Sequence, residues 1–185
     1  MKQEILYTHT YPSPLGPLHL AVNSLGKIIR IGFTPLPAGS NALASNPYRL
    51  VENKYACGEL EYQLDAYFRG ELQTFTVLPE LTGTPFQHSV WARLQKISYG
   101  ETLSYGEIAQ KIGHRQAARA VGNAVAQNPV PIVVPCHRVL YSSGGVGSYA
   151  ARSLPHSDGS AMKRRLLEIE GTRVGVLLKS ARASA

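Results

Sequence analysis

Residues 99–129 of the chain read YGETLSYGEIAQKIGHRQAARAVGNAVAQNP. Ser104 and Glu107 have the spacing of a capping box, which predicts a short helix over 104–112. After a tight glycine turn, a second helix is predicted over about 116–127, because the Asn-Pro pair that follows prevents its continuation. Two short helices joined in this way form a helix-turn-helix pattern. Many such pairs only fill a core, so the pattern alone does not assign a function.

The predicted second helix carries almost no bulky side chain, and Arg115 and Arg119 stand at its beginning. A smooth helix with an arginine near its N-terminus suits contact with nucleic acid. Close packing between helices is the alternative interpretation. The residues that make the helix smooth are Ala117, Ala118, Ala120, Gly122, Ala124 and Ala126.

The next segment, NPVPIVVPCHRVL at 128–140, contains three prolines. Proline cannot donate to a sheet ladder and does not fit inside a helix. We therefore predict a stiff, extended, buried segment that holds Cys136 in a fixed place. Neighbouring side chains of an extended segment point in opposite directions. Direct contact between His137 and the sulfur is then not expected, and a water or a turn would be needed.

Cys136 is a candidate nucleophile, because a thiolate reacts well when a base or positive surroundings allow it to form. His137 is the candidate base, and Glu168 and Glu170 are candidates to orient the imidazole. A buried, inert cysteine is the alternative interpretation.

The fold class predicted for the whole chain is α+β. Thr84, Pro85 and Gln87 have the pattern of a helix start, so we place a domain boundary there. A small N-terminal β-sheet domain with a helix is expected over 1–83, and a mostly helical domain over 84–185. The elements expected in the first domain are strands over 4–11, 18–22 and 27–33, turns over 12–17 and 23–26, a loop over 34–47, and a helix over 57–70.

Composition narrows the class of protein. The chain has 185 residues, 44% of them hydrophobic and 17% charged, which fits a folded protein and not a disordered one. Up to Pro85 there are six Lys/Arg and seven Asp/Glu, a net charge of −1, whereas from Phe86 onward there are thirteen and five, a net charge of +8. This asymmetry favours a polyanionic partner for the second half, with a solvated basic surface as the alternative. No signal peptide or membrane-spanning run is recognised, and two cysteines do not make a disulfide framework, so a cytoplasmic protein is expected.

The sequence PCHRV at 135–139 follows NPVPIVV, SYGEIA and AARAVGNA, and precedes a glycine loop with Tyr149 and the sequence LLEIEG. In this order and spacing the motifs resemble the O-6-alkylguanine-DNA alkyltransferases (methylated-DNA–protein-cysteine methyltransferases). The resemblance is strong over about 84–171. The strands SPLGPLHLAV and GKIIRIGF resemble more loosely the family's N-terminal domain, which is ribonuclease-H-like.

The resemblance implies a winged helix-turn-helix-like DNA-binding unit and a monomer that repairs double-stranded DNA containing alkylated guanine. A methyl or alkyl group passes once and irreversibly from O-6 of guanine to Cys136, without a cofactor, and O-4 of thymine is a second candidate target. His137 is implied as the base, acting through a water and held by Glu170.

The resemblance also implies that Asn128 ties the helix-turn-helix to the cysteine segment. Tyr105 is implied to lie close to the phosphate of the target nucleotide and to help neutralise the charge on the leaving guanine. Arg119 is implied to fill the space in the base stack after the target base is flipped out. Further DNA-binding residues are expected at Arg115, Ala118, Gly122 and Asn123, and further substrate-pocket residues at Val139, Tyr149, Ala150 and Trp91.

Two features depart from the family pattern. The loop RSLPHSDGS at 152–160 is longer than usual, and we expect it to be exposed near the pocket mouth. Some relatives carry an N-terminal zinc, but His9, His19, Cys57 and His88 lack compact ligand spacing, so no metal is expected. Three other functions are weighed against repair: a non-catalytic binder of alkylated DNA, a cysteine hydrolase, and a transcription regulator.

Overall fold

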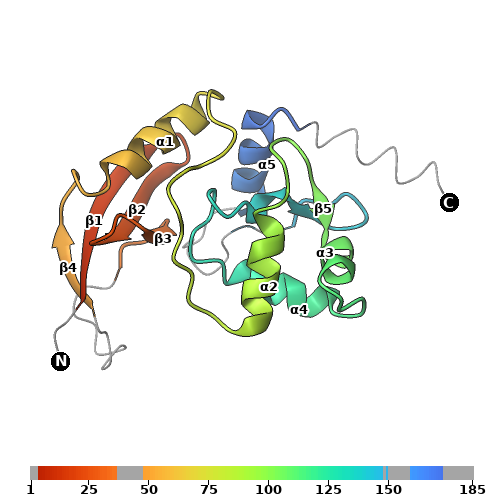
Figure 1. Cartoon of the computed structure of the whole chain (residues 1–185). Helices are drawn as coiled ribbons and strands as arrows, with labels where there is room; N and C mark the ends of the chain where they lie inside the picture. Colours follow the sequence, from red (N-terminus) through yellow and green to blue (C-terminus); the bar gives the residue numbers. More distant parts are fainter. Residues whose placement is uncertain (1–3, 37–47, 148, 150–158, 173–185) are drawn as a thin grey trace. The chain divides into compact units, whose positions relative to one another are not determined.

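The computed structural model of the chain describes residues 4–36, 48–147, 149 and 159–172. The chain divides into two compact units, Met1–Leu81 and Thr82–Ala185. The first unit contains a sheet and the second is mostly helical (Figure 1), so the predicted α+β class is confirmed. Within the described residues, no helix is long and apolar enough to cross a membrane.

Within the described part of the first unit, four strands and one helix form: β1 (Glu4–Ser13), β2 (Gly16–Asn23), β3 (Ile28–Gly32), β4 (Tyr48–Glu52) and α1 (Gly58–Phe68). The strand order is β3–β2–β1–β4; β4 runs parallel to β1, and the other neighbours are antiparallel. The turn predicted over 12–17 is shorter than expected, because the β1–β2 ladder extends to the pair Ser13 and Gly16. The sequence pattern does not predict β4.

The helix α1 lies along the sheet (Figure 1), and the Tyr11 hydroxyl donates a hydrogen bond of 2.6 Å to Asp65. Leu60, Leu64 and Tyr67 are buried, which is the stripe that the helical spacing predicts. Cys57 precedes α1 and is also buried; burial raises the pKa of its thiol to about 11. This thiol therefore stays protonated at neutral pH and is a poor nucleophile.

The second unit is built from short helices. The described elements are α2 (Pro85–Leu94), β5 (Leu103–Ser104), α3 (Tyr105–Lys111), α4 (Ala118–Ala126), the 3₁₀ turn η2 (Cys136–Arg138), β6 (Val139–Leu140) and α5 (Gly159–Ile169). The strands β5 and β6 pair in parallel, and α4 packs against both α2 and α3 (Figure 1).

Both predicted capping boxes are confirmed. The Thr84 hydroxyl accepts from the Gln87 N–H, and the Gln87 side chain accepts in return from the Thr84 N–H. Ser104 and Glu107 do the same at α3. Such reciprocal caps satisfy backbone donors that a helix start otherwise leaves open.

The helix α4 begins at Ala118, two residues later than predicted, because 115–117 form a turn in which the Ala117 N–H donates to the His114 carbonyl. Of the loop expected over 152–160, residues 152–158 lie outside the described residues, and Gly159 and Ser160 already belong to α5.

Candidate active site

The segment that leads to Cys136 is buried as predicted, but it is not extended. The Val134 N–H donates to the Val130 carbonyl at 2.9 Å, which closes a tight turn. Ile132, inside this turn, has a φ of +76°, a region that a β-branched residue rarely adopts. The prolines therefore stiffen a bend, and the bend delivers Cys136 to its position.

Asn128 holds this bend from the inside. Its side-chain amide donates to the Val134 carbonyl at 2.8 Å and to Cys136 Sγ at 3.1 Å, while its Oδ1 accepts from the Val130 N–H at 3.0 Å. One side chain thus connects the end of α4 with the cysteine, which agrees with the tie that the resemblance implies for Asn128.

Cys136, His137 and Arg138 form the single 3₁₀ turn η2, and all three are buried. The alternation expected of an extended segment therefore does not apply to them. The His137 ring points toward the end of α5, where its Nε2 lies 2.6 Å from Glu170 Oε1. Its ring also makes an edge contact with Tyr149, at 6.3 Å between ring centres.

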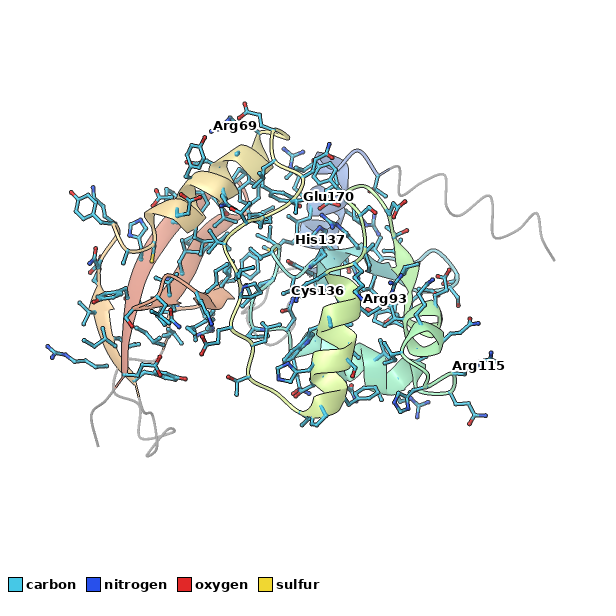
Figure 2. The ribbon with its side chains drawn as sticks, viewed as in Figure 1. Arg69, Arg93, Arg115, Cys136, His137 and Glu170 are labelled. Carbon is cyan, nitrogen blue, oxygen red and sulfur yellow. The ribbon has the colours of Figure 1, made fainter. Side chains whose placement is uncertain are left out.

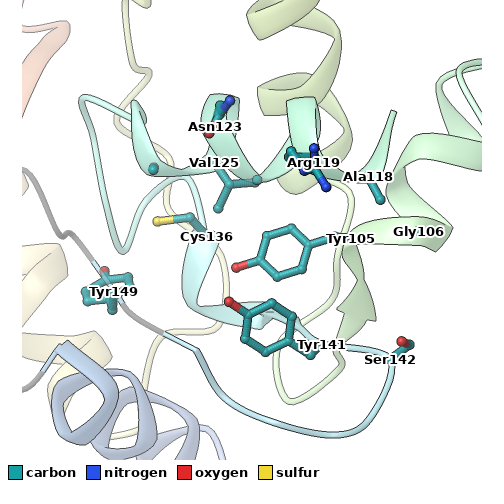
Figure 3. A pocket seen from close by; sticks show the side chains of 12 residues that line it. Tyr105, Gly106, Ala118, Arg119, Asn123, Val125, Cys136, Tyr141, Ser142 and Tyr149 are labelled. Atoms are coloured by element: carbon teal, nitrogen blue, oxygen red, sulfur yellow. The ribbon is translucent and has the colours of Figure 1, made fainter. Parts of the chain in front are cut away.

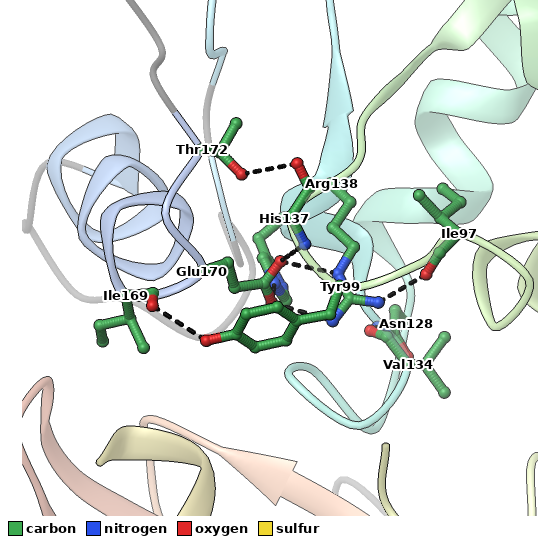
Figure 4. Close-up of polar contacts among 10 residues, drawn as sticks. Ile97, Tyr99, Asn128, Val134, His137, Arg138, Ile169, Glu170 and Thr172 are labelled. Carbon is green, nitrogen blue, oxygen red and sulfur yellow. Dashed lines mark hydrogen bonds and ion pairs between the residues drawn. The ribbon is translucent and has the colours of Figure 1, made fainter. Parts of the chain in front are cut away.

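Glu170 is the centre of a buried charge cluster (Figure 4). Besides His137, it accepts two hydrogen bonds of 2.9 Å from the Arg138 guanidinium and one of 3.2 Å from the Gly100 N–H. The remaining Arg138 nitrogen donates to the Ile97 carbonyl at 2.6 Å. Gly100 permits this close approach, since a Cβ there would lie 3.1 Å from the Glu170 carbonyl oxygen.

The cluster fixes the protonation states of its members. Burial raises the pKa of Glu170, but the hydrogen bonds and charges of His137 and Arg138 outweigh it and lower the pKa to about 2. Burial lowers the pKa of His137, partly opposed by Glu170. At neutral pH the pair is therefore a carboxylate beside a neutral imidazole. Glu168, the other candidate, is exposed and lies 3.5 Å from Arg165, so it does not orient His137.

Burial also raises the pKa of the Cys136 thiol, and hydrogen bonds from Asn128 and Tyr149 and the charge of Lys163 oppose this rise. The resting side chain is therefore a protonated thiol, which needs a base when it reacts.

Lys163 is a buried cation that the sequence analysis does not single out. Its Nζ donates to the Val139 carbonyl at 2.5 Å and lies 5.9 Å from the centre of the Tyr105 ring. Burial lowers the pKa of Lys163 to about 8, although the nearby Cys136 opposes this shift. The sequence contains a pattern that identifies Lys163 as a buried residue. At helical spacing it lies on the same face as Leu166, Leu167 and Glu170.

We expect Lys163→Met to make the Cys136 thiolate harder to form. The ammonium stabilises the thiolate below pH 8, where Lys163 is charged, so its removal should slow the reaction of Cys136 with iodoacetamide several-fold at pH 7.5. The rate is measured by peptide mapping, which separates Cys136 from Cys57. Arg164→Met removes an exposed charge from the same helix and should change nothing; an equal effect of both variants would contradict the prediction.

A pocket of about 580 Å³ lies between α3, α4 and the cysteine turn (Figure 3). Seven predicted residues line it: Tyr105, Ala118, Arg119, Gly122, Asn123, Cys136 and Tyr149. Five further residues line the pocket that the sequence does not predict there: Gly106, Val125, Ala126, Tyr141 and Ser142.

Tyr105 is half-buried at this pocket. Burial, the neighbouring Tyr141 and Cys136 raise the pKa of its phenol to about 12. The phenol therefore stays protonated and can donate a hydrogen bond at any physiological pH.

Contrary to expectation, Trp91 does not line the pocket. It lies in the core between α2 and α4, where its indole N–H donates to the Ala124 carbonyl at 2.9 Å, because a buried indole needs an acceptor. The Val139 side chain is buried in the core, and the Val139 carbonyl, the atom through which the resemblance implies a pocket role, accepts a hydrogen bond from Lys163 Nζ. Ala150 lies outside the described residues.

Arg115 lies apart from Cys136, on the turn before α4 (Figure 2). It lines a shallow hollow there with Gln110, Gly113, His114, Gln116 and Ala117. The exposed side of α4 consists of Arg119, Ala120, Asn123 and Ala126. This face packs against no other described element, so the smoothness of α4 is not explained by helix packing alone. Within the described residues, no group of three or more His, Cys, Asp or Glu side chains is placed to hold a metal ion.

The fold and the pocket define a class: a helix-turn-helix protein with a cysteine nucleophile in a pocket that the second helix borders. Comparisons with known proteins agree. The model of the 6-O-methylguanine DNA methyltransferase ribonuclease-like domain matches residues 6–80, and that of the DNA binding domain of the same proteins matches residues 85–172. The chain belongs to the methylated-DNA–protein-cysteine methyltransferase family, as its motifs suggest.

Individual relatives cover nearly the whole chain. The chain is 41% identical over 167 residues to the methylated-DNA–protein-cysteine methyltransferase of Methanosarcina acetivorans, covering 90% of this chain and 99% of that protein. Its counterpart in Mycobacterium tuberculosis H37Rv is 39% identical over 181 residues, covering 91% and 94%. The crystal structure of Mycobacterium tuberculosis OGT in complex with DNA superimposes with a TM-score of 0.73 at 39% identity, covering 92% of this chain and 98% of that one.

Proposed function

We propose that this protein repairs alkylated DNA by moving a methyl or alkyl group from O-6 of guanine to its own Cys136. The observation that carries the proposal is the pocket in which Cys136 lies beside the smooth, exposed face of α4. A DNA nucleobase can reach a nucleophile in this pocket only if the nucleobase is extruded from the helical stack, as happens in other enzymes that modify nucleobases. We place this chemistry in residues 84–185 and the reaction in the cytoplasm, where the thiols of Cys57 and Cys136 remain free.

The proposed reaction is one displacement. Cys136 Sγ forms a bond to the alkyl carbon while the bond from that carbon to O-6 breaks, and the electron pair stays with guanine. The thiol proton passes through a water to His137, which is neutral at rest and can accept it. Glu170 holds the imidazole and stabilises its charged form. Tyr105 donates a hydrogen bond to the leaving guanine. The thioether formed at Cys136 is not cleaved under mild conditions, so the transfer is irreversible.

This proposal is tested by the intact mass of the protein after exposure to a duplex oligonucleotide that contains one O-6-methylguanine. One methyl group per protein molecule, with no second turnover, supports alkyl transfer. Repeated turnover would instead indicate a cysteine hydrolase, and binding without any mass change would indicate a non-catalytic binder of damaged DNA.

We expect Arg119 to act on the duplex and not on the thiol. Arg119 is exposed at the first turn of α4, at the edge of the pocket. There its side chain can fill the space in the base stack that the extruded nucleobase has vacated. Arg119→Ala should slow alkyl transfer from duplex DNA at least about tenfold, because part of the unstacking cost is no longer recovered. Transfer from free alkylguanine, which needs no extrusion, should change little. Equal losses on the two substrates would contradict this role.

A further inference from the structure

Tyr141 lines the pocket, yet neither the motifs nor the proposed reaction gives it a role. The parallel pairing of β5 and β6 places Leu103 opposite Val139 and Ser104 opposite Leu140. The residues that follow, Tyr105 and Tyr141, therefore leave the strands side by side. Their ring centres are 5.4 Å apart at an angle of 45°. Both hydroxyl groups point into the cavity, toward the side on which Cys136 lies (Figure 3).

The glycine loop after Tyr141 fixes the position of its ring. The Tyr141 N–H donates to the Gly145 carbonyl, and its own carbonyl accepts from the Gly144 N–H, both at 2.9 Å. A Cβ on Gly147 would lie 2.9 Å from the Tyr141 ring, so this loop can close on the ring only with glycine at that position. The ring lies between Tyr105 and the loop and forms part of the pocket wall.

The depth of the pocket sets the direction in which a nucleotide enters. Cys136 is 5% exposed and Tyr149 2%, whereas Tyr141 is 54% exposed and its neighbour Ser142 is also exposed. The alkyl group must reach Cys136 Sγ, so the base enters with its O-6 edge first. Its deoxyribose and the flanking phosphates remain bonded to the strand and stay at the rim. The exposed part of the Tyr141 ring therefore lies where the sugar passes, whereas its hydroxyl group points inward, toward Cys136.

We propose that Tyr141 is a specificity-determining residue whose exposed ring contacts the deoxyribose of the extruded nucleotide. This inference rests on the proposed function and deepens it: Tyr141 favours a guanine that is part of a strand over the free base. Arg119 acts on the base stack, whereas Tyr141 acts on the backbone, so the two residues should differ in the substrates that they affect.

The experiment compares second-order rate constants for one alkyl group on three carriers: free O-6-benzylguanine, and the same base in single-stranded and in duplex oligonucleotides. Tyr141→Ala should react about tenfold more slowly with both oligonucleotides and within about twofold of the wild type with the free base. Tyr141→Phe should react like the wild type, because it keeps the ring that contacts the deoxyribose. Arg119→Ala should be impaired only on the duplex. Tyr62→Ala, which removes another exposed tyrosine, should match the wild type.

Two results would overturn the inference. Unchanged rates on both oligonucleotides would show that Tyr141 makes no contact with the strand. Equal losses on all three carriers would show that it only supports Tyr105 or the loop. If Tyr141→Ala does not fold, Tyr141→Leu is compared in the same way. A wild-type protein that takes no methyl group from a duplex containing O-6-methylguanine would refute the proposed function instead, so the two failures can be told apart.

Discussion

Cys136→Ala is expected to bind alkylated DNA and to transfer nothing. The side chain is buried, and Asn128 and the 3₁₀ turn hold its sulfur at the pocket, so no other described group stands in its place. The loss of transfer should be complete within detection, because the nucleophile itself is removed. Transfer is measured as the mass of one methyl group on the peptide that contains residue 136, and binding as the shift of a labelled duplex.

Cys57 provides the matched control. It is also buried, but it lies beside the β-sheet of the other unit, and its Sγ donates only a weak hydrogen bond of 3.8 Å to the Tyr7 carbonyl. Cys57→Ala should therefore take up one methyl group at the wild-type rate. A methyl group found on Cys57 while Cys136 stays unmodified would contradict both the prediction and the proposed function.

Elements with local causes could be predicted from the sequence. The two capping boxes depend on side chains three positions apart, so each of these helix starts has a local cause. Glu168 and Glu170 are both candidates from their place in the last helix, and only the resemblance to the family singles out Glu170.

Features that depend on distant partners could not be predicted. The strand β4 forms because β1 offers it an edge far away in the sequence. The sequence does not indicate the positive φ of Ile132, because the surrounding contacts impose this backbone conformation. The resemblance implies a place for Trp91 at the substrate pocket, but its indole is buried in the core and donates to the Ala124 carbonyl of α4. Tyr141 gained its place from the pairing of β5 with β6, which the linear sequence does not reveal.

The expected effect of Glu170→Gln is a large loss of both stability and alkyl transfer. Glutamine keeps the size of the side chain but leaves the buried Arg138 guanidinium without its counter-ion. Breaking a buried ion pair in this way costs about 3–5 kcal/mol. His137 loses the carboxylate that orients it, so transfer to Cys136 should fall even in the fraction that remains folded. Chemical unfolding at pH 7 measures the first effect, and single-turnover transfer the second.

The dependence on pH has a definite sign, and α5 supplies a control. The pKa of Glu170 is lowered from 4.5 to about 2 in the folded protein, so its ionic contribution is fully present above about pH 4.5 and is lost as the pH falls toward 2. The difference in free energy of unfolding between the wild type and Glu170→Gln should shrink over that range. Glu168→Gln removes an exposed carboxylate of the same helix, 3.5 Å from Arg165, and should change the free energy of unfolding by less than about 1 kcal/mol at any pH. If Glu168→Gln destabilised the protein as much as Glu170→Gln, the effect would come from the charge of α5 as a whole, and the buried cluster would not be what orients His137.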